Sequence, residues 1–584
     1  MDAINTNGKD AVRLCEHIVR HAFGDVVGRV ASTLLNRGRC TAATVYRLAG
    51  ISRQTANAAL LILIQHNLVG STGASHRDLP EEDMYEFDVS ECLLRLRWPR
   101  ILALTEQNYG EEALLVVRQL LLYGKLTTPE VLTVSNATVD RQKTLSLRKT
   151  VVKLLRRGYI EPTCAELLIL RSDQIDRRYK VGRVAPSWNL TNSPQAKLAE
   201  KSASAGTKLH SVNVLAELRR TAAHEIDEER KQFRDPASAL RQVTNKVGKK
   251  GSSSAMKTKE KVDDSDFEVH DHIPLRVNYD KFNVLIRNEM LIKAAEDRWN
   301  AAAAEVLRAV LQASIEHQKE PKELRTEEGV GINKIVDQIP TSQHKLLMAG
   351  ITGVGSKGIP EIVRQYLAVM SGDDLATDQT GSRFLSHSDH SSPVYWVQIE
   401  NICTSLKASL LIELVRERID DKAARVLAVV ARARYASETM VRDCAMIPLR
   451  EARHILSELQ KLSLIEIQEV PKTAAKGRNM FPGSDYHLWG IDLRKAYGFL
   501  LSGVYKTLAN IVQRRSREME KRAALLAKLD RPDLQGAIEQ YLNAKDQTDL
   551  AELNNATTML SLAETRTDLV VMMLRDLPGG VPPR

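Results

Sequence analysis

One local pattern recurs along the chain and limits the folds that it can adopt. In each copy, the last core leucine of an amphipathic helix is followed, five and six residues later, by two apolar residues that begin an extended segment. The copies are Leu63 with Leu68 and Val69, Leu154 with Tyr159 and Ile160, and Leu459 with Leu464 and Ile465. A polar loop and a second alternating segment follow each copy, at 85–89, 188–190 and 486–491. Helix, strand, loop and strand in this order predict the hairpin end of a winged helix.

The helices upstream complete the first two units. Residues 11–22, 24–37 and 41–49 are expected to be helical in the first, and Ser52 is a competent N-cap for its third main helix. Gly50 suits the tight turn between the last two helices. The second unit is predicted to contain a helix over 111–123, a short helix near 128–130, and a third helix over 144–157 that Gly158 stops.

Two further units follow, and the third is less regular because it lacks the clear leucine spacing between helix and strand. The third is expected to have a long helix from Tyr279 to His317, a short helix over 331–338, a helix opened by Pro360, and a return strand over 394–399. In the fourth unit Pro448 takes the helix-opening position. A chain of 584 residues allows about four domains, which agrees with four such units.

The segments outside these units differ in composition. Residues 235–268 are polar and basic, cannot form a core, and are expected to be disordered. Near the C-terminus an a/d seam is expected, formed by Leu553, Ala556, Leu560, Ala563, Thr567, Val570, Leu574 and Leu577. An earlier set of residues has the same spacing, but Arg515 and Arg522 interrupt its apolar seam. The set is Leu508, Val512, Met519, Leu526 and Leu529. A break at 531–533 then predicts an antiparallel hairpin.

The fold predicted from these patterns is mainly α with small β-wings: four tandem winged-helix domains plus a C-terminal antiparallel coiled-coil hairpin. The expected order is winged helix 1 (1–90), winged helix 2 (91–191), a largely disordered linker (192–277), winged helix 3 (278–400), winged helix 4 (401–492) and the coiled coil (493–584). No stretch approaches the roughly 18 apolar residues of a membrane span, and no secretory signal opens the sequence, so a soluble intracellular protein is expected.

Positive charge is concentrated in two segments. The net charge is +8 over 141–183 and +6 over 241–262, against +10 for the whole chain. On the third helix of the second unit the cations surround the core positions, and they are Arg148, Lys149, Lys153, Arg156 and Arg157. Cations at this density can contact DNA phosphates without reading bases. A solvated face, or one that meets an acidic protein, is the alternative from sequence.

A second candidate for DNA contact is the third helix of the first unit. Arg53, Gln54 and Asn57 have side chains that can pair with base edges. However, five consecutive apolar residues at 60–64 predict that this helix is buried on most sides, which favours protein packing.

No catalytic or metal-binding constellation is recognised in the sequence. The stretch from Gly350 to Lys357 resembles a phosphate-cradling loop, but Ser356 separates the last glycine from the lysine. His387, Asp389 and His390 lie in a polar loop without cysteines, and no Cys-x-x-Cys pair occurs among the six cysteines. A non-catalytic chain without a cofactor or metal is therefore expected.

The opening residues resemble a known family. The stretches 14–28, 34–38, 50–53 and 59–69 are similar to the N-terminal winged helix of the large winged-helix subunit of eukaryotic RNA polymerase III. That family has four winged helices, a long insertion and a C-terminal coiled coil, so the resemblance covers essentially the whole chain. It implies a nuclear, non-catalytic member of the polymerase III-specific initiation heterotrimer, used for small untranslated RNAs such as tRNA and 5S rRNA. The implied partners are the other RNA polymerase III subunits (heterotrimer partners and the polymerase clamp), promoter DNA that the subunit would help to open, and initiation factors, with no membrane.

Two other classes of protein remain open from the sequence. A free-standing winged-helix DNA-binding regulator would read DNA as a dimer with two equivalent basic faces, and one such face is found. A winged-helix protein-interaction scaffold would need no basic face.

Overall fold

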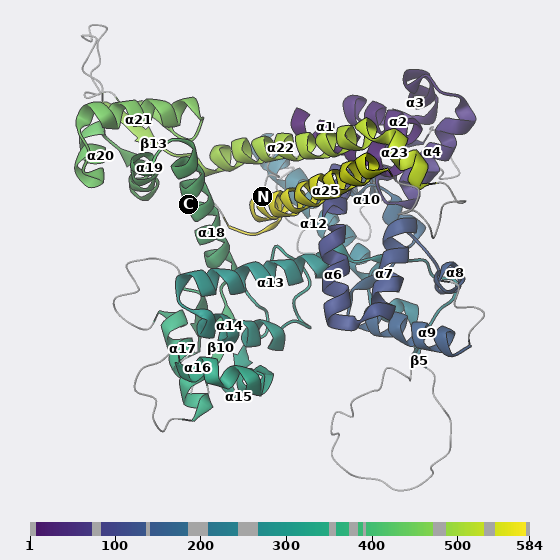
Figure 1. The fold of residues 1–584 in the computed structure, drawn as a ribbon, viewed down its shortest axis with the longest axis horizontal. Coiled ribbons are helices and arrows are strands. Elements are labelled where there is room, and N and C mark those ends of the chain that lie inside the picture. The colour runs from purple at the N-terminus through teal and green to yellow at the C-terminus, as the bar shows by residue number, and fades with distance from the viewer. Residues whose placement is uncertain are drawn as a thin grey trace. The chain divides into compact units, whose positions relative to one another are not determined.

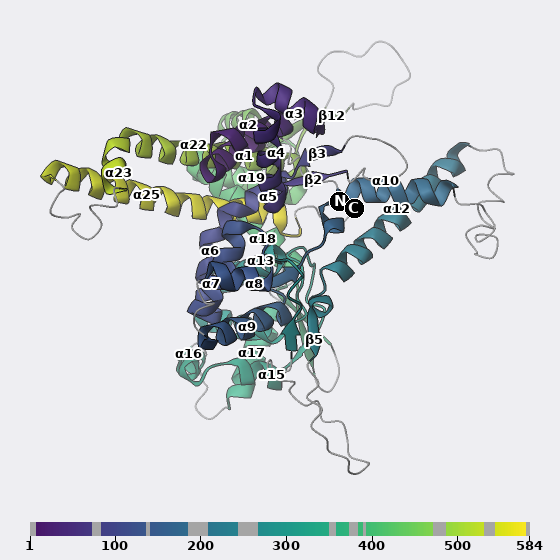
Figure 2. The same cartoon turned by 90° about the vertical axis from the view of Figure 1, so that its right-hand side faces the viewer.

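The computed structural model describes residues 8–72, 83–135, 141–184, 208–242, 267–349, 358–372, 383–388, 393–470, 486–530 and 543–579. The chain divides into two compact units, one of Val12–Tyr279 and the other of Met1–Ala11 with Asp280–Arg584. Helices dominate both units, and the named strands pair in small antiparallel sheets (Figures 1 and 2). The mainly α fold with small β-sheets is therefore confirmed.

The first winged-helix pattern is formed as predicted. Its helices are α1 (Lys9–Phe23), α2 (Asp25–Arg37), α3 (Ala42–Ala49) and α4 (Arg53–Gln65). Its strands β1 (Cys40–Thr41), β2 (Val69–Ser71) and β3 (Met84–Phe87) pair in the order β1-β3-β2. The Ser52 side chain accepts a hydrogen bond from the Thr55 amide and so caps α4. Helices α5 (Val89–Leu94) and α6 (Trp98–Tyr109), joined by η1 (Arg95–Arg97), lead to the next repeat.

The second repeat has the predicted helices but a different return strand. It contains α7 (Glu111–Tyr123), α8 (Thr128–Val134), α9 (Arg141–Arg156) and β4 (Ile160–Pro162). The strand that pairs with β4 is β7 (Leu275–Val277), and Leu126 bridges to Leu275 on its other side. The expected return strand at 188–190 lies outside the described residues.

Cross-strand contacts explain why β7 takes this place. Leu275 and Val277 are buried, and Arg276 between them lies opposite Glu161 in register. The Arg276 guanidinium binds Glu161 at 2.5 Å and Glu91 at 3.4 Å. Burial is the main cause that raises the pKa of the Glu91 carboxyl. A buried cation between two carboxylates fixes the register of β7, and nothing near β7 in the sequence marks that pairing.

Residues 192–277, expected to be a largely disordered linker, contain regular structure. Helix α12 (Lys208–Phe233) packs against α10 (Arg171–Val184), which follows η3 (Ala165–Leu168). Strands β5 (Leu240–Gln242), after η4 (Pro236–Ala239), and β6 (Phe267–Val269) pair with each other. The expectation of disorder over 235–268 is therefore wrong at both ends of that stretch.

The contact between α10 and α12 combines a small apolar core with ion pairs. The small apolar core between α10 and α12 consists of Ile175, Ala222 and Ile226. Around it, Arg171 binds Asp227 at 2.6 Å and Arg178 binds Glu229 at 2.5 Å. Arginine–carboxylate pairs therefore supply much of the contact in this helix pair, in place of apolar residues that sequence patterns reveal.

The third repeat departs from prediction in its first helix. The long helix expected from Tyr279 to His317 is two helices, α13 (Tyr279–Arg298) and α14 (Ala301–Ala313), because Asn300 interrupts it and caps α14 by accepting from the Ala303 amide. The other helices are α15 (Ile332–Gln338), α16 (His344–Ala349), preceded by η6 (Thr341–Gln343), and α17 (Ile359–Ser371). Strands β8 (Val330–Gly331), β9 (Leu385–His387) and β10 (Val394–Val397) pair as β8-β10-β9.

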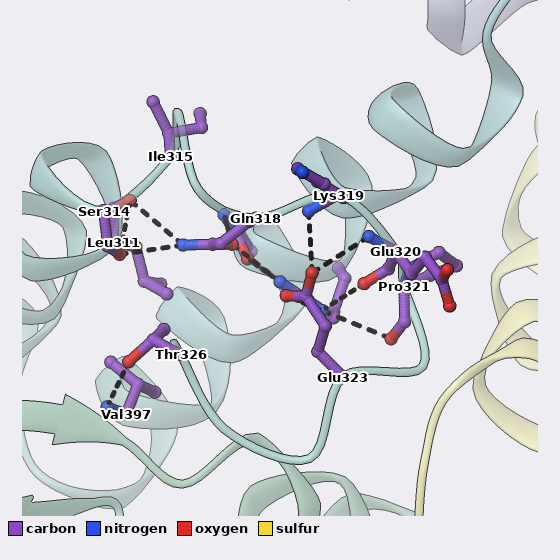
Figure 3. A network of polar contacts seen from close by, with 12 residues as sticks. Leu311, Ser314, Ile315, Gln318, Lys319, Glu320, Pro321, Glu323, Thr326 and Val397 are labelled. Atoms are coloured by element: carbon purple, nitrogen blue, oxygen red, sulfur yellow. Dashed lines mark hydrogen bonds and ion pairs between the residues drawn. The ribbon is translucent and has the colours of Figure 1, made fainter. Parts of the chain in front are cut away.

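A buried polar network holds the connection between α14 and β8. The Arg287 side chain is fully buried and donates to Gln318 Oε1 at 2.6 Å and to the Glu320 carbonyl at 3.1 Å. Figure 3 shows how Glu323 turns back onto the amides of Lys319 and Glu320. These bonds satisfy backbone groups that the irregular connection would otherwise leave unpaired.

The fourth repeat follows the prediction closely. Helix α18 (Ile399–Arg418) leads to α19 (Asp421–Ala433), α20 (Glu438–Ala445) and α21 (Leu449–Lys461), and Pro448 precedes α21 as expected. Strands β11 (Tyr435–Ala436), β12 (Glu466–Val470) and β13 (Tyr486–Gly490) pair in the order β11-β13-β12.

The recurring leucine spacing corresponds to one helix-ending turn. In three repeats, the amide five residues after the core leucine donates to the carbonyl of that leucine: Leu68 to Leu63 (2.9 Å), Tyr159 to Leu154 (3.0 Å) and Leu464 to Leu459 (3.1 Å). The residue before each donor has a positive φ: Asn67 (59°), Gly158 (76°) and Ser463 (56°). This is the six-to-one bond of a Schellman motif, which turns the chain from helix into strand.

The C-terminal part of the chain contains two long helices, α22 (Leu493–Lys521) and α25 (Ala544–Val571). Helix α23 (Ala523–Leu529) extends the first, and η9 (Met572–Asp576) follows the second. Helices α22 and α25 lie side by side in both views (Figures 1 and 2). The two helices run antiparallel, because residues further along the first arm of the hairpin pair with residues earlier in α25. The ion pairs are Arg515 with Glu564, Arg522 with Glu552 and Lys528 with Asp546. The two arginines that interrupt the seam are therefore paired within the hairpin.

Candidate nucleic-acid interface

Helix α9 separates its apolar and basic residues onto opposite sides. Leu147, Val151, Leu154 and Leu155 are buried against the rest of the repeat. Because the helix turns every 3.6 residues, Arg148 lies at the edge of this core and the other predicted cations point away from it. Four of the five lie on α9 and Arg157 follows its last residue. Two flanks with different neighbours hold all of them except Lys149.

The first flank faces β6. Arg148 forms an ion pair with Asp271 at 3.4 Å, and the Arg156 guanidinium lies 4.8 Å from the centre of the Phe267 ring. Both neighbours come from the segment that was expected to be linker. This segment therefore covers part of the face that a winged-helix recognition helix would present to a DNA groove.

The second flank faces the end of α6. The Lys153 ammonium and the Arg157 guanidinium lie 5.5 Å and 5.7 Å from the centre of the Tyr109 ring. The Glu112 carboxylate is nearby and accepts hydrogen bonds from Ser146 and Thr150 on α9. Arg157 is exposed and Lys153 is half-buried, so we call Lys153 and Arg157 the Tyr109 flank. Lys149 is exposed and lies between the two flanks.

The second sequence candidate, α4, is less buried than predicted. Arg53 and Gln54 are exposed in its first turn, next to the Ser52 cap. Only part of the apolar run turns inward, and Leu61 and Ile62 remain 66% and 40% exposed. The prediction of burial on most sides is therefore wrong, because a run of apolar residues on a helix necessarily places some of them on its outer face.

Three contributors to this region were missed by sequence reasoning: Tyr109, Phe267 and Asp271. Phe267 and Asp271 are more than a hundred residues from α9, and no spacing relates them to it. Leu145 is an apolar residue that is 54% exposed within the basic face.

The remaining sequence candidates do not form a reactive centre in the part of the chain that the structure describes. No group of three or more His, Cys, Asp or Glu residues that could hold a metal is found among the described residues. The loop 350–357 lies outside them, as do Asp389 and His390. Among the helices described, none is long and apolar enough to cross a membrane.

Three family models match different parts of the chain. The RNA polymerase III subunit RPC82 helix-turn-helix domain matches residues 13–70, the RNA polymerase III subunit RPC82 model matches 185–344, and the POLR3C C-terminal winged-helix domain matches 411–491. The first and third fall on the repeats with the clearest leucine spacing. The second spans α12 and β7, which the sequence pattern had left outside the domains.

Curated relatives extend the similarity to nearly the whole length. DNA-directed RNA polymerase III subunit RPC3 of Bos taurus and that of Homo sapiens are each 24% identical to this chain, over 96% of it and 97% of the relative. The RPC3 subunit of Yarrowia lipolytica is 22% identical, with the same coverage of both chains. With three models of one subunit matched in order and full-length relatives from animals and a yeast, the chain belongs to the RPC3 family of RNA polymerase III subunits, also described as RPC82 and POLR3C.

Proposed function

We propose that this chain is a nuclear, non-catalytic subunit of RNA polymerase III that supports the initiation of small untranslated RNAs. The observation that carries the proposal is the similarity to RPC3 subunits over 96% of the chain. Its partners would be the other polymerase III subunits, including the clamp and its heterotrimer partners, together with initiation factors and promoter DNA.

We also propose that the four repeats are four winged-helix domains. All four share one strand arrangement, in which the last strand lies between the other two. In the second repeat the place of the first strand is taken by Leu126, which forms a single β-bridge to Leu275 of β7. The second domain would then include β7 as well as the residues before 191, with the α10–α12 helix pair inserted within it.

Within this function, the Tyr109 flank and Lys149 are the proposed contact with DNA phosphates. Lys153 and Arg157 lie beside the Tyr109 ring and Lys149 is exposed, and the flexible stems of lysine and arginine let their heads reach phosphates without base-specific geometry. The exposed Arg53 and Gln54 of α4 are a second proposed contact, with the chemistry to reach base edges.

Salt dependence of DNA binding tests the phosphate contact. A site that neutralises Z phosphates gives a log–log salt slope of about −0.9Z, so losing two contacts flattens the slope by roughly 1.8. We expect this change for Lys153→Gln/Arg157→Gln, which keeps much of each stem over Tyr109. The matched control, Lys345→Gln/Arg364→Gln, removes the same charge from two exposed residues of the other unit.

The outcome also separates the roles of the flank. An unchanged slope in Lys153→Gln/Arg157→Gln, with loss of association with the other polymerase subunits, would show that the flank contacts protein instead. Equal flattening by the control variant would show only a dependence on net charge.

A further inference from the structure

A groove lies beside the basic face of α9, between α8, α9 and β6. Its volume is about 190 Å³. The apolar part of its lining comes from Leu145 and Val152 on α9 and from Phe267 and Val269 on β6. Val152 is 4% exposed and forms part of the floor, whereas Leu145 is 54% exposed. A half-exposed leucine beside an open apolar floor marks a place where another apolar group can pack.

One polar atom of the groove lacks a partner. Thr128 is the first residue of α8, is 1% exposed and lines the groove, and its Oγ1 makes no hydrogen bond. Its neighbour Thr127 provides the capping box with Glu130, so the Thr128 hydroxyl is not needed to cap the helix. A buried hydroxyl without a partner is destabilising, and a ligand that reaches it would recover that loss.

The rim of the groove is cationic. Arg148 and Lys149 line it, and they belong to the segment 141–183 with its net charge of +8. Glu268 is the acidic residue of the lining, and it lies opposite Arg241 in the β5–β6 register. Asp271 engages Arg148 from outside the groove. Lys149 is exposed at the rim, where an acidic group of a ligand could pair with it above the apolar floor.

We propose that this groove binds a short acidic peptide segment of a partner protein, which inserts one tyrosine or tryptophan side chain. An aromatic ring would cover Leu145, Val152 and Phe267, and its O–H or N–H would reach the Thr128 hydroxyl. The acidic flanking residues would lie along Arg148 and Lys149.

Chemistry argues against duplex DNA as the occupant. Duplex DNA offers charged phosphates, which gain nothing from the apolar floor. The groove is therefore distinct from the Tyr109 flank, and the inference does not depend on DNA contact there.

Binding of synthetic probes to the full chain tests the proposal. The probes are fluorescein-labelled acidic peptides, identical except for one central Tyr, Phe or Ala, and their affinities are measured by fluorescence anisotropy. We expect the order Tyr, Phe, Ala. Thr128→Val should weaken the Tyr probe about fivefold, the equivalent of one hydrogen bond, and leave the Phe probe unchanged. Because Oγ1 has no partner, this near-isosteric change should not lower the unfolding midpoint.

Leu145→Asp provides a second variant, because it places a carboxylate at the groove without touching the core. It should weaken both aromatic probes about tenfold or more, through lost apolar contact and charge repulsion. The matched control is Leu122→Asp on α7, where the leucine is 52% exposed and does not line the groove. That control should bind all probes as the unmodified chain does.

Two results would overturn the proposal. One is equal affinity of the Tyr, Phe and Ala probes, or affinity unaffected by both Thr128→Val and Leu145→Asp. The other is weaker duplex DNA binding by the uncharged variant Thr128→Val in parallel with weaker binding of the Tyr probe, which would make the groove part of a nucleic-acid surface. Lys153→Gln/Arg157→Gln should flatten the DNA salt slope while changing peptide affinity by no more than about twofold, so failure of either proposal is seen separately.

Discussion

Single residues at the helix–strand junctions decide whether the recurring turn can form. Gly158 has a φ of 76°, with no atom near the position where a Cβ would stand. Gly158→Ala should therefore destabilise the chain by about 1 kcal/mol through left-handed strain alone. Gly503 lies exposed inside α22 with equally open space, so Gly503→Ala should instead stabilise by about 0.5–1 kcal/mol. Urea unfolding midpoints compare the two variants, and shifts of the same sign would contradict this account.

His66, which ends α4, makes stability depend on pH. Its ring packs 4.7 Å from the Phe23 ring, and burial, together with Arg95 and Lys125, lowers its pKa to about 4. A histidine whose folded pKa is lowered contributes stability at pH above about 6.5, and this is lost as the pH falls towards 4. The loss should reach roughly 2–3 kcal/mol.

His66→Phe keeps the ring contact and removes the titration. We expect it to reduce the fall in the urea midpoint between pH 7 and pH 5. The control His454→Phe changes an exposed histidine of α21 and should leave the fall unaltered. Parallel acid sensitivity of His66→Phe and the unmodified chain would assign the effect to other groups.

At the scale of elements, the sequence predicted what local spacing determines. The three leucine turns, the Ser52 cap and the Pro448 opening all depend on residues within one turn of each other, and all are found in the structure. The pairing of β4 with β7 joins segments more than a hundred residues apart, and it depends on the burial of Arg276 between two carboxylates. Such long-range pairing leaves no periodic trace in a single sequence.

The candidate site shows the same division. The five cations were predicted from charge and helix periodicity, and four of them lie on α9 with Arg157 directly after it. Their separation into two flanks was not predictable, because Phe267 and Asp271 reach α9 through tertiary packing. The pairing of α10 with α12 was not predicted for a related reason: paired and unpaired charges have the same composition.

The helix pair of α22 and α25 depends on a buried ion pair. The side chains of Arg515 and Glu564 are 17% and 14% exposed, and burial raises the pKa of Glu564. Glu564→Leu should cost about 3 kcal/mol, because it leaves Arg515 buried without its carboxylate. Arg515→Leu/Glu564→Leu should recover most of that loss.

A more exposed pair in the same hairpin gives the control. Lys528 is 53% exposed where it meets Asp546, so Lys528→Leu should change stability by less than about 1 kcal/mol. Thermal unfolding of the four proteins measures these effects. A double variant as unstable as Glu564→Leu would show that the pair is required for more than charge balance.

At the scale of the whole molecule, the C-terminal hairpin is where we expect contact with another polymerase subunit. On α25, Met559 and Leu562 are 69% and 45% exposed, three residues apart on the face turned away from α22. Deleting 493–584 would not test this contact cleanly, because the buried Lys407 ammonium of α18 donates to the carbonyls of Leu577 and Gly579. Deletion would therefore leave a buried charge without its acceptors.

Met559→Asp/Leu562→Asp tests the contact without disturbing α18. Two apolar residues at the centre of an interface are together worth about tenfold or more in affinity, so the variant should be depleted to that extent when the polymerase is purified through another subunit. Its unfolding midpoint should match that of the unmodified chain, since neither side chain is buried. The control Leu346→Asp/Met348→Asp alters two residues of α16 that are 37% and 48% exposed. Full recovery of Met559→Asp/Leu562→Asp with the polymerase would place the contact on another face of the chain.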